Sequence, residues 1–240
     1  MTDTAQILAI AGAAEGSWYT VGGVTDLRYK PSFANSNSGM SFGTFQFDVA
    51  TNTDAQRGLK NVLSQAVGAK LVDQATSDRI YAGASMRNAK VHLKPDDLKA
   101  VTTQLAGAYA KGIIDTLDLN RAATVGPWID GMIAEAAATW ATKKVAAAPI
   151  LTPGKPDCLT LFAYLLASLN RYPANEDTCQ TWLNGGKVTT ANGPAGGTQL
   201  KAPPTLDQMH AFFQSLKIWD GTQGDYSNLR ARLDPTLAAL

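Results

Sequence analysis

Residues 13–52 read AAEGSWYTVGGVTDLRYKPSFANSNSGMSFGTFQFDVATN, and the chain is organised around the part from Glu15 to Asn52. The apolar run AQILAIAGAA at residues 5–14 predicts a helix that ends at the glutamate. A polar, Gly-rich excursion follows, and then the alternating segment SFGTFQFD at residues 41–48. This order predicts one acid at the lip of a cleft, with polar groups on the opposite wall.

Glu15 is one of three glutamates in a chain that has seventeen aspartates, so glutamate is not used here as surface filler. A helix C-terminus is negative and apolar neighbours disfavour a charge, so both raise the pKa of a carboxyl placed there. A raised pKa keeps a carboxyl protonated near neutral pH, which a general acid requires. The alternative is an ordinary solvated glutamate in a loop.

The segment GMSFGTFQFD at residues 39–48 alternates between two faces and has flanking glycines, which predicts a hairpin strand. Gly43 would let the backbone approach a ligand closely. Gln46 offers both a donor and an acceptor, which suits a sugar hydroxyl or an acetamide group. Trp18 and Tyr19 follow the glutamate and are of a kind that packs on sugar rings, although they could equally cover the core.

A helix-terminal glutamate, a polar hairpin and the pattern G-x-(S/G)-F-G-x-x-Q-x-D together resemble the catalytic core of the lysozyme superfamily. The similarity is greatest to goose-type lysozymes and soluble lytic transglycosylases. It implies that Glu15 is the catalytic acid and that Gly43 and Gln46 line the sugar cleft. It also implies that Asp26 and Asp48 stand where goose-type enzymes place auxiliary carboxylates that position water.

Cleavage of a glycosidic bond needs an acid at the leaving oxygen. It also needs a group that stabilises or attacks the oxocarbenium-like centre. Asp26 or Asp48 could hold a water if its carboxyl lay roughly 6.5–9.5 Å from Glu15, or act as nucleophile at about 5–5.5 Å. Ser41 and Thr44 are expected to contact the sugar as well, and they are alternative water holders. If none of these side chains lies where it can hold a water or attack the sugar, the glutamate acts alone as acid and then base. This is the lytic-transglycosylase route.

Both aspartates also have structural alternatives. Asp48 could cap the next helix, which begins near Asn52, and Asp26 could be a turn residue. Farther along, the segment LLASLNRYP at residues 165–173 resembles the A-Y-N stretch that contacts substrate in transglycosylases, with a different residue order. This implies a sugar contact for Tyr172, and packing at a helix end is its alternative.

Composition argues against several other classes of protein. Charged residues make up 17% of the chain and the net charge is +1, so the basic footprint of a nucleic-acid binder is missing. His92 and His210 are far apart and show no metal-ligand spacing, so we expect no metal and no cofactor. Cys158 and Cys179 fit two buried free thiols better than a disulfide in a protein made in the cytosol.

The N-terminus lacks a basic region, and its apolar run is short, so we expect neither a signal peptide nor a membrane span. A cell-wall enzyme without a signal leaves the cytoplasm by holin-type release, a secretion machine or lysis. We therefore expect a protein made in the cytoplasm that acts at the bacterial cell wall or periplasm. A phage endolysin or an injected effector fits this, with an immunity or secretion partner as a further expectation.

Helical periodicity dominates the rest of the chain, and the hairpin carries the only good strand signal. The predicted fold is mainly α, a lysozyme-like helical domain with a small β-hairpin lining the cleft. A single domain over residues 1–240 is expected, with a catalytic core at about 1–70 and a helical body at about 70–240. Helices are predicted at residues 54–67, 70–82, 96–117, 127–146 (with Pro127 in its first turn), 157–171, 205–217 and 226–239.

These features predict a peptidoglycan muramidase. It would hydrolyse the β-1,4 bond between N-acetylmuramic acid and N-acetylglucosamine, with Glu15 as general acid. A lytic transglycosylase or a chitinase-like glycosidase is the alternative within the enzyme class, because an acid and a cleft do not identify the sugar. A non-catalytic glycan-binding protein with a lysozyme-like cleft is the alternative outside it.

Overall fold

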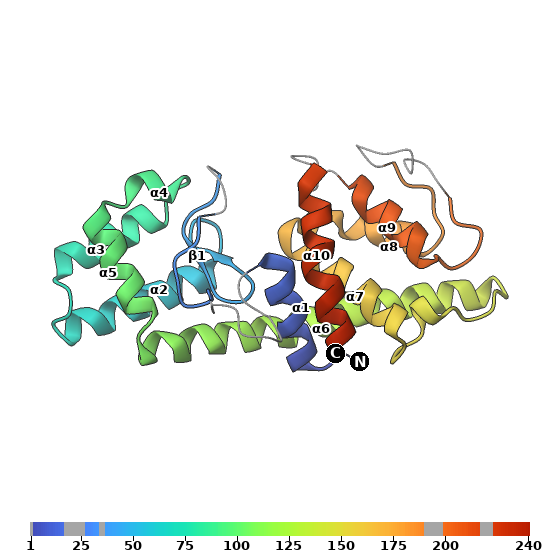
Figure 1. Cartoon of the computed structure of the whole chain (residues 1–240), viewed down its shortest axis with the longest axis horizontal. Helices are drawn as coiled ribbons and strands as arrows, with labels where there is room; N and C mark the ends of the chain where they lie inside the picture. Colours follow the sequence, from blue (N-terminus) through green and yellow to red (C-terminus); the bar gives the residue numbers. More distant parts are fainter. Residues whose placement is uncertain (1, 17–26, 34–36, 190–198, 217–222) are drawn as a thin grey trace. The chain divides into compact units, whose positions relative to one another are not determined.

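A computed structural model of the 240-residue chain describes residues 2–16, 27–33, 37–189, 199–216 and 223–240 (Figure 1). Within these ranges the chain forms ten α-helices, two short 3-10 helices and one two-stranded antiparallel sheet. The fold is mainly α with a small β-hairpin, which confirms the predicted fold class. No helix in the described ranges has both the length and the apolar composition needed to cross a bilayer.

The contacts within the chain group it into two compact units. The first unit joins Met1–Gly22 to Ala122–Leu240, and the second is Gly23–Arg121. The long helix α6 (Ala108–Thr142) therefore contributes residues to both units. This division does not follow the one expected near residue 70, and the single lysozyme-like domain stays a prediction.

The second unit contains the hairpin and the helices that follow it. The sheet pairs Ser41 with Asp48. Asn52 begins α2, because its side-chain oxygen accepts a hydrogen bond from the amide of Ala55. The elements of this unit are β1 (Ser41–Phe42), β2 (Phe47–Asp48), α2 (Thr53–Gly68), α3 (Gln74–Ala84), α4 (Ala89–His92), α5 (Pro95–Leu105) and the first part of α6.

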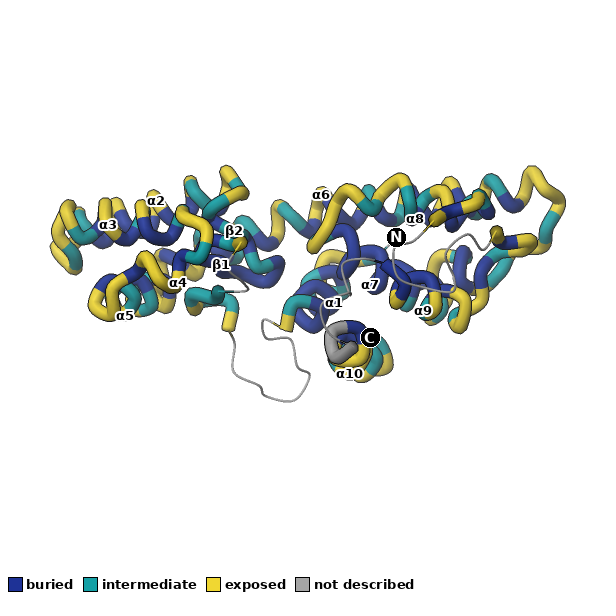
Figure 2. Tube along the Cα trace, turned by 90° about the horizontal axis from the view of Figure 1, so that it is seen from above, coloured by how far each residue is buried: buried dark blue, intermediate teal, exposed yellow. Residues whose placement is uncertain are grey.

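The first unit is built around α7 (Pro156–Arg171), whose residues 161–169 are all buried (Figure 2). Helix α1 (Thr4–Glu15) packs against both α7 and α10 (Gln223–Ala239). The helix predicted at residues 157–171 is confirmed. The remaining elements are the rest of α6, the 3-10 helices η1 (Pro149–Leu151) and η2 (Pro173–Asn175), α8 (Glu176–Leu183) and α9 (Leu206–Ser215).

The largest differences from the predicted helix boundaries lie in α5 and α6. The helix expected at residues 96–117 is interrupted after α5, and α6 then continues through Pro127 to residue 142. A proline inside a helix costs about 3 kcal/mol because it removes a backbone hydrogen bond and its ring crowds the preceding turn. Val125 and Ile129, on either side of this proline, are fully buried. Their burial in the core offsets that cost, so α6 stays continuous.

Candidate active site

Glu15 is the last residue of α1, and an arginine from α10 holds the end of this helix. The guanidinium of Arg232 donates from Nε to the carbonyl of Ala13 at 2.8 Å and from Nη2 to the carbonyl of Ala14 at 2.9 Å. Gly16 closes the helix with a φ of +67°. The last carbonyls of a helix have no hydrogen-bond donor within it. Arg232 supplies donors to two of them, and its positive charge offsets the negative end of the helix dipole.

The carboxyl of Glu15 also contacts the C-terminal turn of α7. The side-chain amide of Asn170 donates to Oε1 at 2.9 Å, and Nε of Arg171 lies 3.9 Å from Oε2. The Glu15 side chain is 12% exposed. The acid therefore reaches the surface over a small area and is surrounded by one amide and two guanidinium groups.

The pKa of Glu15 is raised above its ordinary value, as the sequence predicted. Burial is the main cause, because it disfavours the charged form. Arg171, then the hydrogen bond from Asn170, and then Arg232 act in the opposite direction. The predicted contribution of the helix dipole is offset by the guanidinium on the terminal carbonyls, so we assign the raised pKa to burial.

Gly43 and Gln46 both have backbone conformations that the hairpin turn requires. Gly43 has a φ of +82°, and a Cβ atom there would lie 2.9 Å from Cδ2 of Phe47. Gln46 has a φ of +51°, and its Nε2 donates to the carbonyl of Gly43 at 2.9 Å. The amide of Gly43 also donates to the carbonyl of Arg28 at 2.8 Å, so the turn is tied to the segment before the hairpin.

Asp118 of α6 binds the turn of the hairpin through its carboxylate, and this contact was not predicted from the sequence. Its carboxylate accepts the amide of Thr44 at 2.8 Å and the hydroxyl of Thr44 at 2.6 Å. Burial raises the pKa of Asp118 to about 6, against the hydrogen bonds from Thr44 and Phe45. A signal was present in the sequence, because Asp118 lies four residues from both Ile114 and Ala122 on the apolar stripe of α6.

The other polar residues expected in the sugar cleft serve the hairpin in this structure. Ser41 and Thr44 are buried, so their predicted roles as sugar contacts or water holders would require the hairpin to open. Oδ1 of Asp48 accepts the amides of Gly39 and Ala50 at 2.9 and 2.8 Å. The alternative of Asp48 as a helix cap was wrong, because the side chain of Asn52 caps α2.

The predicted site residues lie in different parts of the chain. Glu15 belongs to the first unit, whereas the hairpin residues belong to the second, and each is described within its own unit. Tyr19 and Asp26 lie outside the described residues. Tyr172 follows α7 and is 52% exposed. From the segment 165–173, Asn170 and Arg171 contact the glutamate.

Groups of three or more His, Cys, Asp or Glu side chains that could hold a metal ion are absent from the described part of the chain. Cys158 and Cys179 are both buried and free, and burial raises the pKa of each thiol. The carboxyl of Glu15, with the Asn170 amide and the positive charge of Arg171 beside it to receive the resulting carboxylate, can offer proton transfer.

No family model, no curated protein and no solved structure matches this chain. The similarity of residues 15–48 to the lysozyme superfamily consequently stays a prediction from the sequence.

Proposed function

We propose that this protein cleaves the glycan strands of peptidoglycan as a muramidase, with Glu15 as the general acid. The observation that carries the proposal is a carboxyl that is mostly buried, has a raised pKa and is held in place by Asn170. A fixed carboxyl with a raised pKa and limited access to solvent suits proton donation to a glycosidic oxygen. On this proposal the protein acts at the bacterial cell wall.

The surroundings of Glu15 support both halves of such a reaction. In the first half, the acid gives its proton to the glycosidic oxygen while the bond from that oxygen to C1 of the sugar breaks. The carboxylate that remains is stabilised by the Asn170 amide and by the positive charges of Arg171 and Arg232, all of which lower the pKa. In the second half, this carboxylate takes a proton from the water that attacks C1, which restores the acid.

A lytic transglycosylase is the second candidate. The hydroxyls of Ser41 and Thr44 are buried, and one oxygen of Asp48 already accepts two amides. Within the second unit, these hydroxyls and this oxygen are therefore enclosed or engaged by the hairpin itself. In a transglycosylase no water is needed, because Glu15 as base takes the proton of the 6-hydroxyl of the sugar and this oxygen closes an anhydro ring on C1.

Digestion of purified peptidoglycan, with soluble products read by mass spectrometry, tests both candidates. We expect the wild type to release muropeptides and Glu15→Gln to release none, because glutamine keeps the shape and loses the proton. Glu135→Gln is the matched control, since Glu135 is exposed on α6, and it should retain full release.

The products distinguish the two reactions. Muropeptides with a reducing end would establish the hydrolase, and products lighter by one water would establish the transglycosylase. Release by Glu15→Gln at the wild-type rate would contradict the assignment of the acid. Retained binding of peptidoglycan by the wild type without release of any product would point to a glycan-binding protein.

A further inference from the structure

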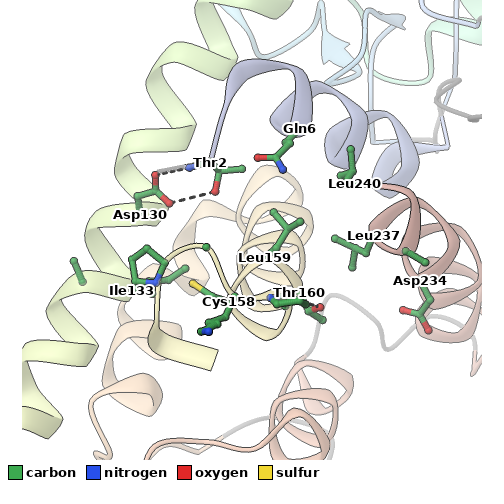
Figure 3. A pocket seen from close by; sticks show the side chains of 16 residues that line it. Thr2, Gln6, Asp130, Ile133, Cys158, Leu159, Thr160, Asp234, Leu237 and Leu240 are labelled. Carbon is green, nitrogen blue, oxygen red and sulfur yellow. Dashed lines mark hydrogen bonds between the residues drawn. The ribbon is translucent and has the colours of Figure 1, made fainter. Parts of the chain in front are cut away.

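The first unit contains a cavity of about 660 Å³ that the Glu15 site does not share (Figure 3). Four segments form its walls: the start of α1, the middle of α6, the turn before α7 with the first turn of that helix, and the end of α10. Glu15 lies at the opposite end of α1 and is not among the lining residues. The volume is within the range of about 300–1,000 Å³ that is typical of small-molecule sites.

Most of the lining is apolar. The side chains of Ile133, Leu159, Leu237 and Leu240 face this space, together with the thiol of Cys158 (Figure 3). Water in contact with such walls gives up hydrogen bonds. Displacement of this water by an apolar ligand therefore lowers the free energy of binding. The walls therefore favour a ligand with a hydrocarbon core.

One carboxylate on the wall is fixed in place. The amide of Thr2 donates to Oδ2 of Asp130 at 3.1 Å, and the hydroxyl of Thr2 approaches Oδ1 at 3.4 Å (Figure 3). Each carboxylate oxygen can accept a second hydrogen bond. Within the described ranges, no lysine or arginine forms an ion pair with Asp130.

The other charged groups of the lining differ from Asp130. Asp234 is paired with Arg230 at 3.4 Å and accepts a hydrogen bond from the hydroxyl of Tyr164 at 3.2 Å. Lys155 is exposed at the start of α7, where its ammonium group can remain in water. The cavity thus presents one fixed carboxylate whose charge is not paired by a described basic side chain, beside an apolar wall.

We propose that this cavity binds a small molecule with an apolar body and one protonated amine, and that the amine binds to Asp130. A charged hydrogen bond to a partly buried carboxylate is stronger than a neutral one, so the amine should bind better than its neutral analogue. An acid of the same shape would face the charge of Asp130, and it should bind worst. The proposal does not depend on the function of Glu15, because the two sites have no residue in common.

Three probes with one hydrocarbon body test the proposal: 4-phenylbutylamine, 4-phenylbutanol and 4-phenylbutyrate. Titration of the ¹⁵N-labelled full chain with each probe gives its affinity, and the amides that shift give its location. We expect shifts at the cavity residues and about tenfold tighter binding of the amine than of the alcohol, as one charged hydrogen bond provides. The acid should bind more weakly than the alcohol.

Three variants make the test specific. Asp130→Asn keeps an acceptor for Thr2 and removes the charge, so it should weaken binding of the amine about tenfold and leave the alcohol unchanged. Asp78→Asn, an exposed position on α3 in the second unit, is the matched control and should change neither. Ala134→Trp fills the cavity from an exposed position on α6 and should abolish binding of both.

Several results would overturn the proposal. These are the absence of saturable binding by every probe, shifts at residues outside the cavity, and equal affinities for the amine and the alcohol. Tighter binding of the acid would likewise contradict it, as would an Asp130→Asn variant that binds the amine as the wild type does.

Discussion

The side-chain amide of Asn170 donates a 2.9 Å hydrogen bond to the carboxyl of Glu15, although 155 residues separate the two in the chain. One residue ends α1 and the other lies in the last turn of α7, so the packing of these two helices sets the position of the acid. An acid held by secondary structure keeps its orientation more closely than one on a loop, which suits proton transfer.

Asn170→Ala should slow peptidoglycan cleavage at least about tenfold, because the acid loses the group that orients it. The same change removes a hydrogen bond that lowers the pKa of Glu15, so this pKa should rise further. The alkaline limb of the pH–rate profile, which reports the acid, should move to higher pH. Asn61→Ala, at an exposed position on α2, is the control, and an unchanged profile in Asn170→Ala would contradict this role.

Arg232→Ala should lower the free energy of unfolding by about 1–3 kcal/mol, because two carbonyls at the end of α1 lose a charged donor. Arg230→Ala, two residues away on the same helix, removes a half-exposed ion pair with Asp234 and should cost about 1 kcal/mol or less. Urea denaturation of the two variants measures the difference. Equal losses would mean that Arg232 does not anchor α1.

Asp118 should make stability depend on pH. Its pKa is raised to about 6 by burial, so the folded chain binds its proton more tightly than the unfolded chain does. The stabilisation from that proton is complete below the ordinary pKa of 3.8 and is lost as the pH rises through about 6. The loss amounts to about 3 kcal/mol at most, as an order of magnitude.

Urea denaturation of wild type and Asp118→Asn between pH 4 and pH 7 measures this effect, because asparagine does not titrate. The unfolding free energy of the wild type minus that of the variant should fall as the pH rises. A difference that stays constant over this range would show that the carboxyl is not perturbed in the folded chain.

Gly43→Ala should destabilise the hairpin through both its backbone and its packing. A φ of +82° costs an L-residue about 1–2 kcal/mol, and the new Cβ would meet the ring of Phe47 at 2.9 Å. Gly154→Ala is a matched control, since Gly154 has a φ of +80° and nothing within 4 Å of the added carbon. Thermal or urea unfolding should show the larger loss for Gly43→Ala, and a larger loss for the control would refute the packing argument.

The sequence predicted local features well where one segment decides them. The helix at residues 54–67 was found to within a residue at each end, because its apolar face has a clear helical period. The capping box of Asp3 and Gln6 at the start of α1 is likewise a feature of one short segment. The position of Glu15 at the end of that helix also followed from its neighbours alone.

Features that depend on distant residues were not predictable in this way. The course of α6 through Pro127 depends on burial of the adjacent residues in the core. The partners of Glu15 come from α7 and α10, and local periodicity does not specify which helices meet. Asp118 was missed because its partner Thr44 lies 74 residues away. No residue near Asp118 in the sequence explains why a carboxylate stands in an apolar stripe.

The pKa of Glu15 is the property on which its role as an acid depends, and it can be measured directly. The chain has three glutamates, so protein labelled with ¹³C at the glutamate carboxyl gives three titration curves by NMR, and Glu15→Gln identifies the curve of interest. We predict that Glu15 titrates at a clearly higher pH than the glutamate of a model peptide in the same buffer, because its carboxyl is buried. A curve for Glu15 at or below that of the peptide would contradict the assignment of Glu15 as a general acid.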